Sequence, residues 1–258
     1  MDKTAKILVL DIETMPMEVY VWDLKEQYIR HTQIKQDWTI GAWSAKWLGD
    51  PARKLFYADT SKQSNLRDDK PILLKLKELL EQADFIMTQN GKLFDWPKIK
   101  ARFVLNGIQP PKFFKHVDVY QELKHIGFTS HSLDYITSKI NKKYQKLHHK
   151  KYPGLSLWLE CLKHNKEAWA EMKLYNGYDV LATEEMYDLT KQWQPKTIHK
   201  MQIIGDCCPT CGGKSFGSGG LRAKDGVQYR RLFCKSCGKY LSVDLAVKLG
   251  KVAPEVDK

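Results

Sequence analysis

Short apolar runs alternate with amphipathic segments over about the first 195 residues of the chain. The run Ile7-Leu8-Val9-Leu10 is short and rich in branched residues, which is typical of a buried strand. Further strands are predicted at residues 39–47, 55–58, 85–89 and 116–120, the last as a short strand or a strand-to-helix transition. We therefore predict an α/β fold with helices around a mixed sheet.

Helical periodicity fills the segments between and after these strands. Residues 69–82 carry apolar side chains at positions 72, 73, 76, 79 and 80, with Pro71 in the first turn. Other helices are predicted for residues 96–105, for a segment that begins at Ser130 or Ser132 and ends at Ile140, and within residues 155–193.

The composition changes near residues 195–206, beyond which Cys, Gly and Lys are frequent and the apolar pattern fades. We therefore predict two domains, residues 1–197 and residues 198–258. The apolar run near the start has four residues, too few for a signal peptide, and no stretch approaches the ~20 apolar residues of a membrane span. We expect neither a signal peptide nor a membrane association.

The chain is basic, with a formal net charge of +12. A basic surface suits a polyanionic partner, and nucleic acid is the first candidate. The alternative is a basic protein without such a partner. The lysine-rich run at residues 139–151 favours contacts with a phosphate backbone or, equally, a solvated helix end and loop.

Four acidic residues in three separate stretches carry the candidate chemistry. Asp11 and Glu13 follow the first apolar run, and residues i and i+2 of a strand point to the same side. Asp95 opens the predicted helix after strand 85–89, while Tyr175 and Asp179 share one helical face. Converging carboxylates repel one another unless a cation lies between them, and oxygen ligands suit Mg²⁺ or Mn²⁺. These residues predict a divalent metal site, against the alternative of surface acids and a buried tyrosine.

Asp118 follows another short apolar stretch. It is either a further acid beside the site or a residue that caps the start of a helix.

The three stretches resemble the motifs of the DEDD 3′–5′ exonucleases, which have a ribonuclease H-like fold. The Asp-x-Glu motif matches Asp11 and Glu13, and the second motif matches Asn90, Phe94 and Asp95. The third motif of the tyrosine branch matches Tyr175 and Asp179, while Leu174 stands where the histidine branch has His. The resemblance covers about residues 5–193 and is nearest to family B polymerase proofreading domains and stand-alone bacterial or phage exonucleases.

The resemblance implies phosphodiester hydrolysis with two Mg²⁺ or Mn²⁺ ions. Asp11 would bridge both ions, Glu13 and Asp179 would complete the site that activates water, and Asp95 would hold the second ion partly through water. Tyr175 would orient the attacking water. Asn90 and Phe94 would position the terminal nucleotide.

The expected substrate is DNA, preferably single-stranded, ahead of RNA. A replication or repair protein is a further candidate partner, and the expected location is the cytoplasm of a bacterial or phage-infected cell. Two alternatives stay open: a binding or recruitment protein with an inactive nuclease core, and a structure-specific endonuclease on the same fold.

Five of the six cysteines lie after position 206. Cys208 and Cys211 form one Cys-x-x-Cys-Gly motif, and Cys234 and Cys237 form another, with 22 residues between the inner cysteines. This spacing predicts a structural Zn²⁺ site and resembles a zinc ribbon. Residues 221–233 predict its hairpin, with a turn at 225–226. Interleaved basic and aromatic residues suit nucleic acid, with a protein partner as the alternative. A redox dithiol would need a βαβ context, which is absent here.

Overall fold

The computed structural model describes residues 5–25, 28–112, 114–148, 151–191, 193–194, 215–224, 227–236, 238 and 240. The chain divides into two compact units, Lys6–Gln194 and a second made of Met1–Ala5 and Pro195–Lys258. The predicted boundary between residues 197 and 198 lies outside the described residues.

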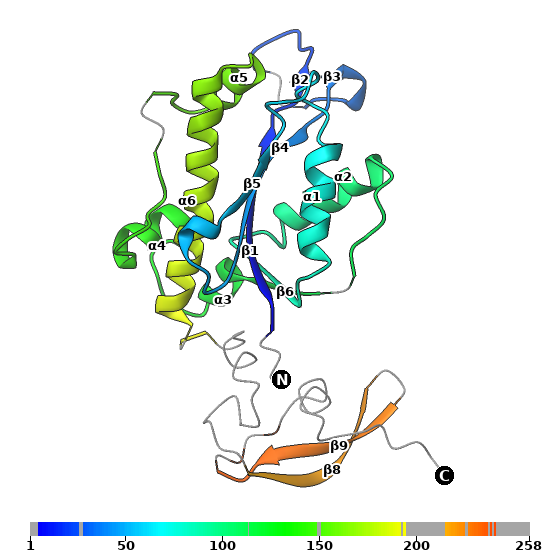
Figure 1. Cartoon of the computed structure of the whole chain (residues 1–258), viewed down its shortest axis with the longest axis vertical. Coiled ribbons are helices and arrows are strands. Elements are labelled where there is room, and N and C mark those ends of the chain that lie inside the picture. Colours follow the sequence, from blue (N-terminus) through cyan, green and yellow to red (C-terminus); the bar gives the residue numbers. More distant parts are fainter. Residues whose placement is uncertain are drawn as a thin grey trace. The chain divides into compact units, whose positions relative to one another are not determined.

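A five-stranded mixed sheet forms the centre of the first unit (Figure 1). Its strands lie in the order β5 (Phe56–Asp59), β4 (Thr39–Trp47), β1 (Ile7–Met15), β6 (Phe85–Thr88) and β7 (Lys115–Asp118). Strand β1 pairs antiparallel with β4 along most of its length and parallel with β6 at Ile7, Leu8 and Val9, so both of its edges are hydrogen-bonded in that first part. The predicted mixed sheet is confirmed.

Helices cover both faces of this sheet (Figure 1). Helices α1 (Lys70–Leu80) and α2 (Asp95–Leu105) lie on one side, and α6 (Lys166–Thr190) runs along the other. Helices α4 (Leu133–Ile140) and α5 (Ser156–Leu162) pack on α6, and α3 (Val119–Leu123) follows β7 directly. Residues 116–120 are therefore the strand-to-helix transition.

The alternation of side chains along β1 separates two parts of the core. Leu8, Leu10 and Ile12 pack in the cluster that contains the buried side chains of α1 and α2. Met15 packs instead with α5 and α6, in a cluster that includes Trp169. Because the period of a strand is two, Asp11 and Glu13 share the face of Met15 and point toward α6.

Helices α4 and α6 begin at residues whose side chains satisfy free backbone N–H groups. Of the two predicted caps for α4, the structure uses Ser132, whose Oγ accepts the Tyr135 N–H at 3.2 Å. Asn165 caps α6 by accepting the N–H groups of Glu167 and Ala168. Within the described residues, no helix combines the length and the apolar character needed to cross a membrane.

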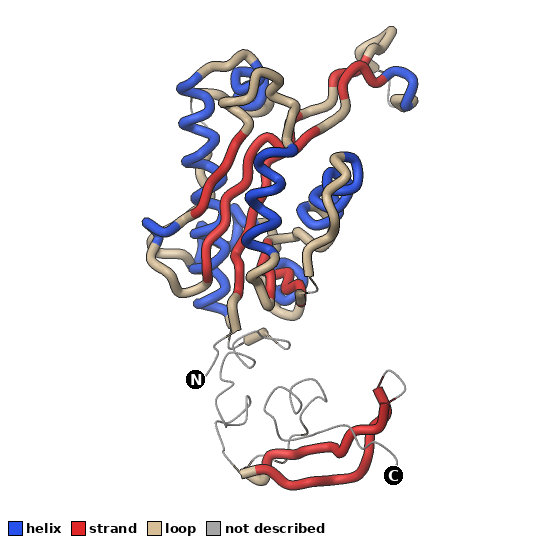
Figure 2. Tube along the Cα trace, turned by 45° about the vertical axis from the view of Figure 1, so that its right-hand side comes forward, coloured by secondary structure: helices blue, strands red, loops and turns tan. Residues whose placement is uncertain are grey.

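Between β1 and β4 the chain forms a ribbon that projects from the first unit (Figure 2). It contains β2 (Glu18–Val19), β3 (Ile34–Gln36) and the 3₁₀ turn η1 (His31–Gln33); a second such turn, η2 (Ala52–Lys54), precedes β5. Arg67 fixes the base of the ribbon by donating to the Pro16 and Asp37 carbonyls, both at 2.9 Å, and to Glu18 at 3.0 Å. The sequence pattern did not predict this ribbon.

In the second unit, strands β8 (Phe216–Lys224) and β9 (Val227–Cys234) form an antiparallel hairpin. The predicted hairpin is thus confirmed, although its first strand begins five residues earlier than expected. The turn at residues 225–226 lies outside the described residues, as do Cys208, Cys211 and Cys237. Cys234 is buried at the end of β9. The zinc site stays a prediction.

Candidate active site

The apolar run predicted the acidic pair at the end of the strand. In the structure, the pair lies within β1. Strand β1 continues to Met15, and its register against β4 shifts by one residue between Glu13 and Thr14. Asp11 pairs with Ser44 and Glu13 with Ala42 on β4. The backbone of both acids is therefore fixed by the ladder, and only their side chains can adjust.

Helix α6 brings Asp179 to this pair. One carboxylate oxygen from each of Asp11, Glu13 and Asp179 lies within 4.8 Å of the others. Gly177, two residues before Asp179, leaves room for Leu55, since a Cβ there would lie 2.8 Å from Leu55 Cδ2. Three carboxylates from two elements thus converge on one point.

Asp95 joins this group from the other side of β1. It is the first residue of α2, is buried, and accepts the Ile12 N–H at 3.1 Å. Its carboxylate lies close enough to Asp11 for its negative charge to raise the Asp11 pKa. It stands outside the set of three that lie within 4.8 Å.

The loop before Asp95 is held by Asp118. The Asp118 carboxylate accepts the Asn90 N–H at 2.9 Å and the Lys92 N–H at 3.0 Å. Asn90 adopts a left-handed φ of 62°, and its exposed side chain has no described contact with the carboxylates. Asp118 makes no side-chain cap bond to α3, so it is an acid beside the site that shapes this loop. The predicted role of Asn90 stays a prediction.

Two further polar side chains meet the carboxylates, and sequence reasoning did not single out either of them. Lys146 Nζ lies 2.7 Å from Asp179 Oδ2 and 4.6 Å from the centroid of the Tyr175 ring. Asn176 is fully buried, and its Nδ2 donates to Asp11 Oδ2 at 2.6 Å. The sequence feature that could have pointed to Asn176 is its position between Tyr175 and Gly177, on the helix that also carries Asp179.

The segment that carries Lys146 is fastened to α6. The Glu185 carboxylate accepts the N–H groups of Lys142, Lys143 and Tyr144, with the shortest bond, 2.7 Å, to Tyr144. The buried Asn141 donates to the Ala182 carbonyl at 2.9 Å. These bonds direct one lysine of the basic run toward the carboxylates.

Comparison of the sequence with known protein families shows which family the chain belongs to. Residues 28–191, well over half of the chain, match the family model of the RNase H superfamily. The chain belongs to the RNase H superfamily. No curated protein matches it.

Solved structures with a similar fold include a family B DNA polymerase from the hyperthermophilic archaeon Pyrobaculum calidifontis. The identity is 12% and the TM-score is 0.50. The match covers 77% of this chain and 26% of the polymerase, so the chain spans about a quarter of that protein's length. At this identity the likeness shows a shared fold.

In this RNase H superfamily protein, burial raises the pKa of Asp11, Glu13 and Asp95. The pKa of Asp11 lies well above its ordinary value because of burial and then the charges of Asp95, Asp179 and Glu13. Burial and the charge of Asp179 raise the pKa of Glu13 to about 8. Burial also raises that of Asp95 to about 7, against the opposing N–H bond from Ile12.

Such a group of acids has a high affinity for a cation, because a cation removes both the desolvation and the repulsion. The donors are all hard carboxylate oxygens, which fits Mg²⁺ or Mn²⁺.

A hollow of about 400 Å³ opens beside Glu13. Its lining residues are Glu13, Thr14, Pro16, Phe94, Leu155 and Trp158. The volume is in the range of small-ligand sites, and most of the lining is apolar or aromatic. Phe94, predicted to contact a terminal nucleotide, is 42% exposed and forms part of this wall.

Leu174, where the histidine branch has its histidine, is 52% exposed on α6. Tyr175 is partly buried next to Lys146.

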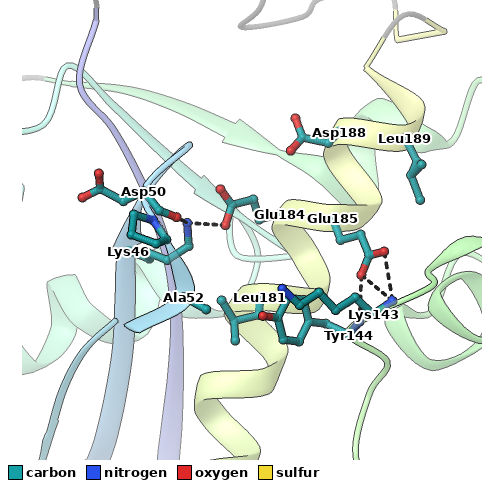
Figure 3. A pocket seen from close by; sticks show the side chains of 11 residues that line it. Lys46, Asp50, Ala52, Lys143, Tyr144, Leu181, Glu184, Glu185, Asp188 and Leu189 are labelled. Atoms are coloured by element: carbon teal, nitrogen blue, oxygen red, sulfur yellow. Dashed lines mark hydrogen bonds and ion pairs between the residues drawn. The ribbon is translucent and has the colours of Figure 1, made fainter. Parts of the chain in front are cut away.

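Another hollow, of about 360 Å³, lies where β4 and the loop after it face α6 and residues 143–144 (Figure 3). Lys46 is 1% exposed there and forms an ion pair with Glu184 at 2.5 Å. The same ammonium donates to the Asp50 carbonyl at 2.6 Å, and Glu184 accepts the Gly49 N–H. Because these polar groups are paired with one another, this hollow is a structural junction and is not part of the candidate site.

Proposed function

We propose that the protein is a metal-dependent 3′–5′ exonuclease, with single-stranded DNA as its favoured substrate. The observation that carries the proposal is the convergence of Asp11, Glu13 and Asp179 within 4.8 Å on an RNase H-superfamily sheet. Tyr175 lies one helical turn before Asp179 on α6, and Asp95 is the first residue of α2. Both positions fit the tyrosine branch of the DEDD exonucleases. The fold shared with a family B DNA polymerase is consistent with a nucleic-acid substrate.

The carboxylates would hold two Mg²⁺ or Mn²⁺ ions. When bound, these ions supply a water of lowered pKa and offset charge on the attacking and leaving oxygens. Asp11, which lies among the other acids, would be a ligand of both ions, and Glu13, Asp179 and Asp95 would supply the other carboxylate ligands. Asn176 orients the Asp11 carboxylate through its 2.6 Å bond.

Tyr175 and Lys146 act on the attacking water and on the phosphate. Burial and the Asp179 charge raise the pKa of Tyr175 to about 12, so the phenol keeps its proton at neutral pH. Tyr175 therefore orients the attacking water by hydrogen bonding and does not deprotonate it. Burial alone would lower the pKa of Lys146, but Asp179 and Tyr175 outweigh it and raise that pKa. The ammonium stays charged and can contact a phosphate oxygen.

The hollow beside Glu13 favours action at a strand end. Its aromatic walls suit one unstacked base, because bases stack on aromatic side chains without sequence preference. A base at a frayed or single-stranded end can enter such a hollow without the cost of unpairing. This supports single strands as the preferred substrate.

The test is digestion of a 5′-labelled single strand with Mg²⁺ or Mn²⁺, for which we expect a ladder of shortened products. Asp179→Asn should abolish the ladder and leave strand binding largely intact. Asp188→Asn is the matched control, because Asp188 lies on the same helix but is half exposed and pairs only with Lys191 in the described structure. No ladder from DNA or RNA with either metal would refute the proposed exonuclease.

Two other outcomes distinguish the alternatives. Cleavage of circular single-stranded DNA would indicate an endonuclease. Strand binding without turnover, unchanged by Asp11→Ala, would indicate a binding or recruitment protein.

For the second unit, we extend the proposal to a structural Zn²⁺ held by Cys208, Cys211, Cys234 and Cys237. Metal analysis of the purified protein, beside a Cys234→Ser variant, tests it. One zinc per chain that is lost in the variant is the expected result. A replication or repair protein remains the proposed partner, and the cytoplasm the proposed location.

A further inference from the structure

Trp158 lies between the hollow and the carboxylates. It is on α5 and lines the hollow together with Phe94 and Glu13. Its side chain makes a hydrogen bond with Glu13, in which the indole N–H is the donor. Its ring meets the Tyr175 ring edge-on, with centroids 6.3 Å apart and planes at 81°. One side chain therefore contacts the hollow, a proposed metal ligand and the residue proposed to orient water.

The helix that carries Trp158 is firmly placed. Leu157 and Cys161, on either side of Trp158 along α5, are fully buried. They pack in the same cluster as Ala168 and Trp169 of α6, and Trp169 Nε1 donates to the Cys161 carbonyl at 3.0 Å. The backbone of Trp158 is thus fixed, and the freedom that remains is that of its ring, which faces the hollow.

We propose that Trp158 is a positioning residue, which couples occupancy of the hollow by the terminal base to the placement of Glu13 and Tyr175. The inference rests on the proposed exonuclease function. A base that stacks on the indole restricts its orientation. Because the same indole donates to Glu13 and packs against Tyr175, a fixed indole fixes both of these side chains. The rate of hydrolysis then depends on the base of the departing nucleotide, although no bond to the base is broken.

Phe94 lies on the hollow without these links. It precedes α2 as its N-cap residue, is 42% exposed, and has Lys98 Nζ 5.9 Å from its ring centroid. Within the described residues, no hydrogen bond or ring–ring contact joins it to Glu13 or Tyr175. Phe94 should therefore contribute to binding of the terminal base, and Trp158 to the rate after binding. Phe94→Ala is expected to raise KM with little change in kcat, and Trp158→Phe to lower kcat.

The decisive experiment compares two enzymes on two substrates. The substrates are one single strand with a normal 3′-terminal nucleotide and the same strand with an abasic 3′-terminal sugar. The wild-type enzyme should cut the abasic end more slowly in single turnover, by on the order of 10-fold, because Glu13 and Tyr175 are less well placed. In Trp158→Phe the ring is kept but the N–H bond is lost, so both ends should be cut at similar, reduced rates.

Trp169→Phe is the matched control. Trp169 is 5% exposed in the same cluster, and its replacement also removes one indole N–H bond, but this bond goes to a backbone carbonyl. We expect this variant to be less stable and to keep the full difference between the two ends. A structural effect of losing any tryptophan here would instead affect both variants alike.

Three results would overturn the inference: equal single-turnover rates on both ends in the wild type, a full base effect in Trp158→Phe, or loss of that effect in Trp169→Phe. The first needs no variant, so a misfolded Trp158→Phe leaves the inference testable. Failure of the wild type to cut either strand would instead refute the proposed function.

Discussion

We predict that Gly91→Ala displaces the Asp95 carboxylate, because the added methyl group takes space next to it. A Cβ on Gly91 would lie 2.8 Å from Asp95 Oδ2 and 2.5 Å from Thr88 Cβ, and closer still to Thr88 Oγ1. Thr88 cannot retreat, because it is buried in β6 and its Oγ1 is 2.7 Å from His116 Nε2. The loop that carries Gly91 and the Asp95 carboxylate must therefore move.

The magnitude follows from this crowding. Adding a methyl group to a well-packed interior costs about 1–3 kcal/mol in the free energy of unfolding. Gly91 is not among the described glycines with positive φ, so no backbone strain adds to this cost. If Asp95 moves by about 1 Å, the rate of a reaction that depends on its position falls by about 10²-fold. The loss of rate should thus be far larger than the loss of folded protein.

The assay combines urea unfolding with single-turnover hydrolysis, and Gly107→Ala is the control. Gly107 follows the same helix α2 with a φ of 66° and no atom within 4 Å of the added Cβ. Alanine there costs about 1–2 kcal/mol through the left-handed backbone, without approaching Asp95. We expect both variants to be destabilised and only Gly91→Ala to lose rate. If Gly91→Ala is destabilised but hydrolyses at the wild-type rate, the rate does not depend on the position of Asp95 and the reasoning is wrong.

Three other predictions concern single side chains. Lys146→Gln should lower kcat by about 10²-fold, since a charged donor to the reacting phosphate is lost, while Lys142→Gln, at an exposed position of the same segment, should not. Lys46→Met should lower the free energy of unfolding, measured by chemical denaturation, by about 3–5 kcal/mol because the Glu184 charge loses its ammonium partner, and adding Glu184→Leu should restore most of it (Figure 3). Burial lowers the pKa of His116 to about 4. The unfolded state therefore binds a proton that the folded state does not, so His116 contributes a loss of stability of at most about 3 kcal/mol as the pH drops from about 6.5 to about 4. His116→Gln should remove this contribution, and a difference in unfolding free energy between wild type and variant that stays constant over this pH range would contradict the assignment.

The sequence predicts those parts of the site that depend on local periodicity. Asp11 and Glu13 share a face because the period of a strand is two, and Tyr175 and Asp179 share one because they are four residues apart on a helix. Asp95 was placed at a helix start, and α2 begins there. The five strands of the sheet and its main helices were predicted for the same reason.

The parts that sequence could not predict depend on contacts between distant segments. The basic run contains several lysines, and Lys146 is the one that reaches Asp179 because Glu185, about 40 residues later, fixes the preceding backbone. Trp158 contacts Glu13 only after α5 packs on α6. The ribbon after β1 has strands of two and three residues, too short for any period to show.

The pairing of β1 on both edges has a consequence for how this centre can change. For Asp11 or Glu13 to shift at the backbone, β1 must separate from β4, with which both residues pair next to the stretch Ile7–Val9 that β6 also holds, and this amounts to opening the centre of the sheet. Such an opening needs nearly the full free energy of unfolding, so the amide hydrogens of this pair should be among the slowest to exchange. Asp95 and Asp179 arrive on helices, whose small displacements leave the sheet intact. Any adjustment of the spacing between the carboxylates, by a bound strand or over evolution, will therefore come from α2 and α6, with the acids of β1 as the fixed reference.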